Sequence, residues 1–436
     1  MVKKKVLHIV NENALGGGIG TILDYLTEGI NKSKEFSSDN LITNYEVKRV
    51  GKDESGNPKY LSRPKDSKLK IHNSSGKIQE VQNVTHKDLE RLLENYDIVH
   101  VHGIPHYGIL EHLEKLKGKH PKIVNTAHSS VKQELLAQYE NAKKEGKEYE
   151  FNSLKYLLEN NILNDPTKFE GNYWGSAIHR QEKVMTLGDS IQHMNESYMN
   201  SIIGEYHAEE NKDKHTVIPN GVKISERETK KRPQKKRILF VGRFSKEKGI
   251  DELIDSIPYI LESNPDAEIR LVGGDKEGKL IKEYQNKLNI KIKEFIKKNP
   301  HKNLEEILGK VKFTGWISDK NELKKHYEWA DYVVIPSYAE SFSLTASEAL
   351  LNGRIPVMTA TPALKNLYID KGIGLGIELE KRHGKGIAET MNKILEKDKT
   401  NEYDALIEKG KKYVKENYSY KKMIENQINS YKKILN

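Results

Sequence analysis

A predicted loop and helix in the second half of the chain carry two carboxylates at a fixed separation. Residues 335–350 read IPSYAESFSLTASEAL, with Glu340 in the loop and Glu348 on the early turns of the helix. Ser341 and Ser343 are helix-capping residue types, and the free N–H groups at a helix N-terminus bind phosphate. Glu348 would then accept hydrogen bonds from vicinal ribose hydroxyls. Two unrelated surface carboxylates are the alternative.

Two basic residues bracket a loop that follows another predicted strand. Residues 241–249 read VGRFSKEKG, so Arg243 and Lys248 lie where the chain leaves the strand and enters a helix. A guanidinium and an ammonium directed at one point suit a diphosphate. A solvated pair of charges is the alternative that the spacing leaves open.

A glycine-rich turn follows the first predicted strand. Residues 14–21 read ALGGGIGT and lead into a helix, which lets backbone amides approach a phosphate at the positive end of the helix dipole. The frame that starts at Gly16 and Gly18 places Thr21 where a dinucleotide fingerprint has glycine or alanine. No Lys-Ser/Thr pair follows, as it would in a Walker loop. A plain tight turn is an equal alternative.

Three histidines lie at the ends of predicted strands in the first half of the chain. Residues 97–103 read DIVHVHG, and alternation along a strand points His100 and His102 to the same face, as two metal ligands would lie. The sequence shows no third ligand nearby, and imidazoles at strand ends more often hydrogen-bond locally, so we predict no metal site. His128 ends the next strand, where it either faces a ligand or is a satisfied core histidine.

These residues must be positioned by short apolar runs that alternate with amphipathic helical segments. The predicted strands cover residues 6–10, 98–101, 123–126 and 191–194 in the first half, and 238–241, 269–272, 311–314, 332–335 and 355–358 in the second. The alternation predicts an α/β fold with parallel sheets covered on both faces. Because there are two such series, we expect two Rossmann-like domains that face each other across a cleft, with ligands at the carboxyl ends of the strands.

Changes in composition set the expected boundaries. The predicted segments are a first domain over 1–222 with irregular inserts at 34–83 and 131–172, a Lys/Arg-rich linker over 223–237, a second domain over 238–419, and an amphipathic helix over 420–436 that packs back on the first domain. Within the first insert, NSSG at 73–76 separates two alternating runs and predicts a hairpin.

Composition excludes several classes of protein. Of the 436 residues, 36% are hydrophobic, which is enough to build packed cores and excludes global disorder. The absence of cysteine excludes disulfide scaffolds, thiolate metal centres and cysteine nucleophiles. The net charge of +10 fits a solvated surface, a phosphate-bearing ligand, an anionic membrane or nucleic acid. No run has the length of a signal peptide or a membrane span, so we expect a cytoplasmic protein.

The ordered set of motifs resembles that of a family-4 retaining glycosyltransferase of the GT-B fold. The matching stretches are the glycines at 16–18, DIVHVHG at 97–103, VIPNGV at 217–222, GR at 242–243, KG at 248–249, VKFTGW at 311–316, the glutamates at 340 and 348, and ALLNGRIPV at 349–357. They span nearly the whole chain in the expected order, whereas the two inserts match nothing specific.

The resemblance implies a role for each matching residue. Arg243 and Lys248 would bind the donor diphosphate, and Glu348 would bind the ribose. Glu340 would lie beside the transferred sugar, which His128 would contact from the first domain. The remaining implied contacts are the amides of Ser341, Phe342, Ser343 and Leu344 with the distal phosphate and donor sugar, Gly16, Gly17 and Gly18 with the diphosphate and acceptor, and the segment near Trp316 with the nucleobase.

The resemblance also implies the reaction. We expect a hexosyl group to pass, with retained configuration, from a nucleoside-diphosphate sugar, above all a UDP-sugar, to a hydroxyl acceptor of unknown class. We expect no metal and no further cofactor, since no Asp-x-Asp motif accompanies the site residues. The alternatives are a sugar-nucleotide epimerase on the same fold, and a basic nucleic-acid-binding protein, which lacks a known reader motif. Peripheral contact with the inner face of an anionic membrane is a further alternative for the location.

Overall fold

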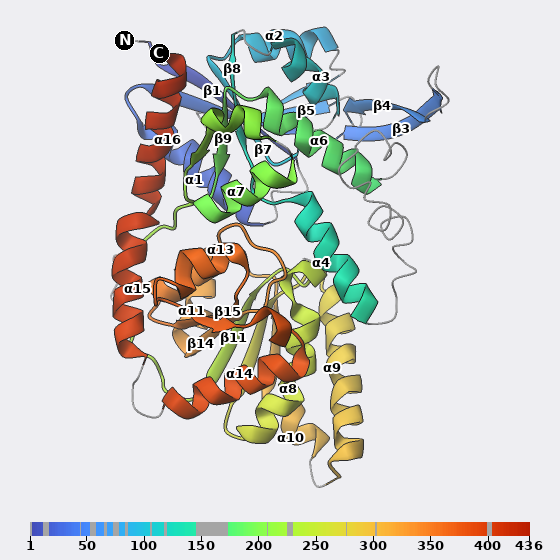
Figure 1. Cartoon of the computed structure of the whole chain (residues 1–436), viewed down its shortest axis with the longest axis vertical. Helices are drawn as coiled ribbons and strands as arrows, with labels where there is room; N and C mark the ends of the chain where they lie inside the picture. Colours follow the sequence, from blue (N-terminus) through green and yellow to red (C-terminus); the bar gives the residue numbers. More distant parts are fainter. Residues whose placement is uncertain are drawn as a thin grey trace. The chain divides into compact units, whose positions relative to one another are not determined.

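Two compact units make up the computed structural model, shown in Figure 1. Unit 1 consists of Met1–Gly221 and Tyr420–Asn436, and unit 2 of Val222–Ser419. The structure describes residues 2–11, 17–43, 45–52, 58–64, 68–72, 78–82, 86–104, 107–116, 120–144, 173–206, 208–224, 230–275, 277–300, 303–398 and 403–436. Among these residues, no helix combines the length and the apolar character that crossing a membrane requires.

Unit 1 is built on a mainly parallel sheet. Over its described residues the sheet has eight strands in the order β10-β9-β8-β7-β1-β2-β5-β6. The strands are β1 (Lys4–Asn11), β2 (Phe36–Thr43), β5 (Lys68–His72), β6 (Ile78–Gln82), β7 (Ile98–His102), β8 (Lys122–Thr126), β9 (Ser190–His193) and β10 (His215–Val217). Pairing is parallel from β10 to β2 and antiparallel from β2 through β5 to β6.

Helices cover the sheet of unit 1. They are α1 (Gly18–Lys32), α2 (His86–Glu94), α3 (Tyr107–Leu116), α4 (Val131–Lys144), α6 (Tyr173–Leu187), α7 (Glu196–Glu205) and α16 (Tyr420–Leu435). Leu7 and Ile9 of β1 join a core with Leu89 of α2 and Ile109 of α3. The alternate residues of β1 point to the opposite face, because side chains along a strand alternate between the faces of a sheet.

The helix α16 packs in unit 1, which confirms that the chain crosses back to its first domain. Tyr420 packs edge-on against Tyr25 of α1, with ring centroids 5.5 Å apart. Tyr431 is fully buried, and its ring lies 5.7 Å from that of Phe36 in β2. The apolar face that the sequence predicted for this helix therefore belongs to the core of unit 1.

The range predicted as an irregular insert at 34–83 contains regular structure. β2 lies within the main sheet, and β5 and β6 form the antiparallel pair that was predicted around residues 73–76, themselves outside the described residues. A separate antiparallel pair joins β3 (Tyr45–Lys52) to β4 (Pro58–Pro64), as Figure 1 shows. The sequence analysis did not predict β2 as a strand, because it recognised strands by apolar runs and the sequence of β2 is polar.

Unit 2 is a six-stranded, all-parallel sheet over its described residues. The strands are β11 (Arg237–Gly242), β12 (Glu268–Gly273), β13 (Val311–Gly315), β14 (Tyr332–Ile335), β15 (Ile355–Thr359) and β16 (Leu375–Ile377). Their order is β13-β12-β11-β14-β15-β16. In chain order this is 3-2-1-4-5-6, the doubly wound Rossmann arrangement. The direction of winding reverses between β11 and β14, where ligands bind in such folds.

Helices enclose this second sheet. They are α8 (Ile250–Ser263), α9 (Lys279–Lys298), α10 (Leu304–Leu308), α11 (Lys320–Trp329), α12 (Leu344–Leu351), α13 (Pro362–Leu364), α14 (Gly384–Lys397) and α15 (Asp404–Asn417). Ile250, Leu253, Ile254 and Ile257 of α8 are completely buried in the core. Burial of each such side chain contributes about 1.5–3 kcal/mol, so α8 is firmly held beside the loop that precedes it.

The segment predicted as a linker, 223–237, is partly built into unit 2. Residues 225–229 lie outside the described residues, and Arg237 already begins β11. Arg232 is almost completely buried and forms an ion pair with Asp398. A side chain buried in this way ties the end of the linker to unit 2.

Candidate functional site

Two loops meet at the carboxyl edge of the sheet in unit 2, where β11 and β14 are neighbours. Gly249 ends the loop after β11 with φ +67°, a conformation that favours glycine. A Cβ atom on Gly249 would lie 2.0 Å from the carbonyl oxygen of Pro336, which follows β14. The two loops are thus in direct backbone contact, and only glycine fits between them.

Lys248 and Glu340 join these two loops through their side chains. Lys248 Nζ donates a hydrogen bond of 2.8 Å to Glu340 Oε1, and Ser337 Oγ donates to the same oxygen at 2.9 Å. The side chains of the pair are 26% and 12% exposed, respectively. The structure therefore brings together a cation and a carboxylate that the sequence predicted from two separate motifs.

Arg243 begins the same loop with its guanidinium at the surface. Its Nη2 donates to Glu247 Oε1 at 2.9 Å, and Ser245 Oγ donates to that oxygen at 2.7 Å. The side chain of Arg243 is 55% exposed. Exposed ion pairs contribute little to stability, so this guanidinium can exchange its carboxylate for a phosphate at small cost.

The helix α12 begins beside the loop that carries Glu340. Its N-cap, Ser343, has φ +71° and ψ +91°, and its Oγ accepts a hydrogen bond from the Ala346 amide at 3.3 Å. A positive φ is unfavourable for a residue with a side chain, and it persists only where the surroundings hold it. Tyr368 does this, since its hydroxyl donates to the Ser343 carbonyl at 3.1 Å and lies 2.8 Å from Ser347 Oγ.

The side chain of Phe342 packs in the interior of unit 2. It is buried, and its ring packs edge-on against Tyr418 and Tyr368, with centroids 5.0 and 6.4 Å away. Phe342 can therefore meet a ligand only through its backbone, as the sequence analysis expected for the stretch from Ser341 to Leu344. This packing fixes the loop immediately before α12.

Glu348 lies on α12 and is half-buried. Tyr327 of α11 donates a hydrogen bond of 2.8 Å from its hydroxyl to Glu348 Oε2. Burial raises the pKa of Glu348, and the hydrogen bond from Tyr327 opposes that rise. Sequence reasoning missed Tyr327, because a tyrosine on the apolar side of a helix is expected to pack rather than to hold a carboxylate.

The remaining predicted contacts are more scattered. Trp316 follows β13, which lies two strands from β11, and its side chain is half-buried. In unit 1, Gly17 is the N-cap of α1 and Gly18 its first residue, whereas Gly16 lies outside the described residues. The roles given to these residues stay predictions.

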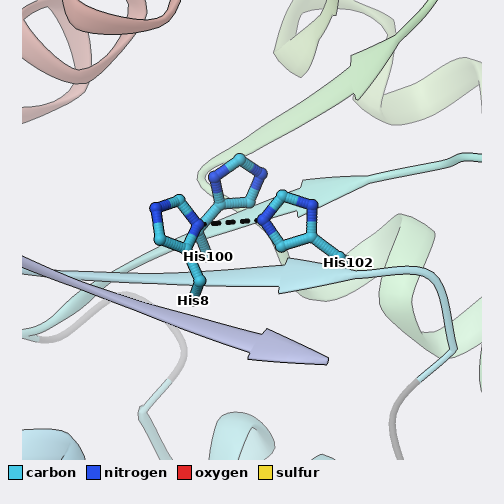
Figure 2. A group of neighbouring side chains, drawn as sticks. All are labelled: His8, His100 and His102. Atoms are coloured by element: carbon cyan, nitrogen blue, oxygen red, sulfur yellow. Dashed lines mark hydrogen bonds between the residues drawn. The ribbon is translucent and has the colours of Figure 1, made fainter. Parts of the chain in front are cut away.

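A row of histidines lies on one face of the sheet in unit 1, shown in part in Figure 2. His8 of β1 pairs in register with His100 of β7, and His102 follows on the same face of β7. One nitrogen atom of each of the three lies within 4.8 Å of those of the other two. We expected His100 and His102 to share a face, and they do. The expectation that no third ligand lies nearby was wrong, because His8 comes from a strand about ninety residues earlier in the sequence.

These imidazoles are hydrogen-bonded to one another and to the core. His8 Nδ1 lies 2.9 Å from His102 Nε2, and His102 Nδ1 lies 3.1 Å from His128 Nε2. His100 uses one nitrogen for the Tyr431 hydroxyl and the other for Thr126 Oγ1, both at 2.6 Å. Burial lowers the pKa of His8 to about 3 and that of His128 to about 4, so both rings are neutral at pH 7.

Comparison with known proteins gives a family model that matches unit 2. Residues 222–413 match the family model "Glycosyl transferases group 1", a range that contains the loops after β11 and β14 and the whole of α12. The match covers nearly all of unit 2 and less than half of the whole chain. The residues on the carboxyl edge of unit 2 therefore lie within the range that resembles glycosyl transferases, and this similarity supports the predicted class of enzyme.

Relatives and solved structures agree on the class and the fold. The chain is 30% identical over 197 residues to an uncharacterized glycosyltransferase of Methanocaldococcus jannaschii, covering 45% of each chain. Sucrose-phosphate synthase from Thermosynechococcus elongatus matches 99% of both chains with a TM-score of 0.63 at 15% identity. Anabaena HepE, solved in complex with UDP, matches 98% of this chain and 100% of its own with a TM-score of 0.61 at 12% identity.

These comparisons confirm two Rossmann-like domains of the GT-B type. The chain spans less than half the length of the curated relatives that it matches. Membership of family 4 within the GT-B fold stays a prediction.

Proposed function

We propose that the protein transfers a hexosyl group from a UDP-sugar to a hydroxyl acceptor with retention of configuration. The observation that supports this proposal most strongly is made at one edge of the sheet in unit 2. There Lys248 of one loop donates a hydrogen bond to Glu340 of the next loop, and α12 begins shortly after Glu340. Cations and helix N–H groups at one place suit a diphosphate. UDP is chosen as the nucleotide because the structurally similar HepE was solved with UDP.

Charge builds on the departing diphosphate during such a transfer. In the proposed mechanism Arg243 and Lys248 bind its oxygens, and the amides around Ser343 hold the distal phosphate. Groups fixed in place before the reaction stabilise this charge without reorganisation, typically by a few kcal/mol for each donor. We therefore propose that no metal and no further cofactor is needed, and that activity survives EDTA.

The sugar and the acceptor complete the proposed reaction. Glu340 lies beside the transferred hexose, and His128 is the residue of unit 1 that contacts it. The bond between the anomeric carbon and the diphosphate oxygen breaks, and the acceptor oxygen bonds to that carbon on the face from which the diphosphate departs. The departing phosphate oxygen takes the proton of the acceptor hydroxyl. In this mechanism the Glu340 carboxylate lies beside the sugar as a fixed charge, and it does not act as a nucleophile.

The ribose has its own partner in this proposal. The Glu348 carboxylate would accept hydrogen bonds from the two ribose hydroxyls, while Tyr327 fixes its orientation from behind. The backbone near Trp316 would lie along the base. The shape of the pocket and its backbone groups would determine which base and which sugar bind.

A two-stage experiment tests the proposal. First, nucleoside-diphosphate sugars are screened for a rise in melting temperature, because a ligand that binds the folded state stabilises it by mass action. The best donor is then incubated with hydroxyl acceptors, and the glycoside and the released diphosphate are measured. Stabilisation by UDP-sugars with glycoside formation supports the proposal. Conversion of the donor alone into an epimer would instead support the epimerase.

Two proposals on location and partners accompany this function. We propose a cytoplasmic enzyme that does not bind nucleic acid, which the absence of a mobility shift with RNA or DNA would support. Contact with an anionic membrane surface stays a prediction, and sedimentation with liposomes of anionic lipid tests it.

A further inference from the structure

A buried carboxyl group holds the loop that carries Glu340. Glu252 belongs to the first turn of α8 and is only 7% exposed. The Tyr338 hydroxyl donates a hydrogen bond to Glu252 Oε1, and the side chain of Tyr338 is buried as well. In the loop after β14, Tyr338 lies two residues before Glu340. The hydrogen bond therefore ties the start of α8 to a segment of the candidate site.

The backbone of Tyr338 is held from two further sides. Its N–H donates to the Glu247 carbonyl oxygen at 2.8 Å, which connects the loop after β14 to the loop after β11. Its carbonyl oxygen accepts a hydrogen bond of 3.3 Å from Arg382 Nη1, and the guanidinium carbon of Arg382 lies 3.8 Å from the centre of the Tyr338 ring. Tyr338 thus links α8, the loop after β11 and the segment before α14.

The neighbours of Tyr338 in the sequence belong to the candidate site. Ser337 Oγ donates to Glu340 Oε1 at 2.9 Å, and the same oxygen accepts a hydrogen bond of 2.8 Å from Lys248. Only Ala339 separates Tyr338 from Glu340. Because residues this close in the chain cannot move independently, a shift of Tyr338 would displace both the Ser337 hydroxyl and the Glu340 carboxylate.

Stability does not account for a glutamate at position 252. Glu252 Oε2 has no hydrogen-bond partner among the residues that the structure describes. Two lysines of α9 pair with its neighbours on α8, Lys287 with Asp251 and Lys291 with Asp255. Burial of a carboxyl group whose second oxygen lacks a partner costs free energy, and a leucine would pack here without that cost. The role of Glu252 is therefore to be sought in the hydroxyl that it holds.

Glu252 can hold Tyr338 in both of its charge states. Burial raises the pKa of Glu252 to about 7, so the group is partly neutral at pH 7. The charges of Asp251 and Asp255 also raise this pKa, and the hydrogen bond from Tyr338 opposes the rise. With the proton on Oε2, Oε1 still accepts a hydrogen bond, because a neutral carboxyl group keeps acceptor capacity. Burial raises the pKa of Tyr338, so its hydroxyl remains a donor.

We propose that Glu252 is a positioning residue for the transfer reaction: it holds the Tyr338 hydroxyl and thereby fixes the segment that carries Glu340. This inference rests on the proposed function for the reaction, whereas the fixing of the segment is independent of it. Displacements of about 1 Å away from the reacting atoms can slow an enzyme severely, because the reacting groups must be held in a narrow range of geometry. Glu252 acts through Tyr338 and does not itself touch the sugar.

Hydrogen exchange tests the positioning without any activity. The full-length protein is labelled and digested, and exchange is followed in the peptide that covers residues 337–342. The reporter is the Tyr338 amide, which is hydrogen-bonded to Glu247. We expect exchange to be about tenfold faster in Tyr338→Phe and in Glu252→Leu, because one buried hydrogen bond is lost in each. Native exchange in both variants would overturn the proposal.

Kinetics supply the second readout. We expect Glu252→Leu and Tyr338→Phe each to lower kcat by about tenfold, the size of one lost buried hydrogen bond. The Kd for UDP should stay within about twofold of its native value, because Arg243 and Lys248 lie in the other loop. Glu252→Gln should keep the native kcat, since its amide oxygen accepts the same hydrogen bond. A loss in Glu252→Gln equal to that in Glu252→Leu would refute the proposal.

A double variant and a matched control separate positioning from general damage. Because Glu252 and Tyr338 act through one hydrogen bond, Glu252→Leu combined with Tyr338→Phe should lose no more activity than either change alone. A further tenfold loss, or about that, would show independent roles and contradict the proposal. The control is Tyr259→Phe, also on α8, where the ring packs edge-on against Phe295 with centroids 5.4 Å apart. It should leave exchange in residues 337–342 and kcat unchanged.

The two readouts distinguish this inference from the proposed function. If no UDP-sugar is turned over but exchange accelerates in Tyr338→Phe and Glu252→Leu, the proposed function fails and the fixing of the segment stands. If a UDP-sugar is turned over and both variants keep the native kcat, the proposed function stands and the positioning role is refuted. Tyr338→Phe removes the hydrogen bond from its other side, so it decides the matter alone if Glu252→Leu does not fold.

Discussion

Lys248 and Glu340 form a hydrogen-bonded ion pair of 2.8 Å between the loops that follow two neighbouring strands, β11 and β14. Glu340 is the more buried partner, and Ser337 fixes its orientation. A phosphate that binds Lys248 therefore competes with a carboxylate already in place. The contributions of the two residues to donor binding and to turnover should then be separable.

Glu340→Gln should strengthen UDP binding while slowing transfer. Removal of the negative charge leaves Lys248 available to bind phosphate. We expect the affinity for UDP to rise by about threefold, because a partly exposed charge contact contributes an energy of this size. Loss of the carboxylate beside the sugar should lower kcat by about a hundredfold. Calorimetry and initial rates measure the two effects. Glu262→Gln, at the exposed far end of α8, is the control. Weaker UDP binding in Glu340→Gln would refute the competition.

Tyr368→Phe should weaken binding of the distal phosphate. The substitution removes the hydroxyl that hydrogen-bonds the Ser343 carbonyl and Ser347. Ser343 is then no longer held at its positive φ. We expect UDP affinity to fall by about tenfold, since one buried hydrogen bond and the geometry of the helix N-terminus are lost. Tyr413→Phe, in the same aromatic cluster beside Tyr418, should bind UDP normally. Equal effects of both changes would contradict this role for Tyr368.

Glu348 should make UDP binding depend on pH. Its pKa is raised by burial, so it becomes protonated at a higher pH than an ordinary glutamate. The carboxylate is the form that accepts two ribose hydrogen bonds. The affinity of the native protein should therefore fall as the pH is lowered through this raised pKa. Glu348→Gln should bind UDP about tenfold more weakly at pH 8 and show no such fall.

The same raised pKa has a consequence for stability. The folded state holds the proton of Glu348 more tightly than the unfolded chain does, so the stability that this group contributes is lost as pH rises through the pKa of the folded state. Without ligand, Glu348→Gln should therefore have a higher melting temperature than the native protein at pH 8, with the difference vanishing in acid. A lower melting temperature at pH 8 would show that the carboxylate is structural.

Gly249→Ala should destabilise unit 2 because of one backbone contact. The new Cβ would lie 2.0 Å from the Pro336 carbonyl oxygen at a positive φ, which should cost about 3 kcal/mol or more. Gly278→Ala is the matched control, with φ +73° and no atom within 4 Å of the new Cβ, and should cost only about 1–2 kcal/mol. Denaturant unfolding measures both. Equal costs would mean that the loops are not in contact.

The sequence predicted the parts of the site that follow strand ends. Arg243, Lys248 and Glu340 lie in the loops that follow apolar runs, and the carboxyl ends of neighbouring parallel strands meet at one edge. The contact between Lys248 and Glu340 therefore needed only the order of strands.

Other relationships were beyond the reach of sequence patterns. Tyr368 and Tyr327 reach the site across the packing of separate helices, and no spacing rule relates them to Ser343 or Glu348. His8 meets His100 because β1 and β7 are adjacent, although they are about ninety residues apart and other strands intervene in the sequence. Pairing between distant parallel strands leaves no local pattern, so the third histidine was missed.

The central claim is that the loop after β11 binds the diphosphate of a nucleotide, and calorimetric titration of UDP into Lys248→Ala tests it most directly. Lys246→Ala, two residues earlier in the same loop, is the control. We predict that Lys248→Ala weakens UDP binding by at least about tenfold, the size of a lost charge-assisted hydrogen bond, while Lys246→Ala binds like the native protein. Unchanged UDP affinity in Lys248→Ala would contradict the account.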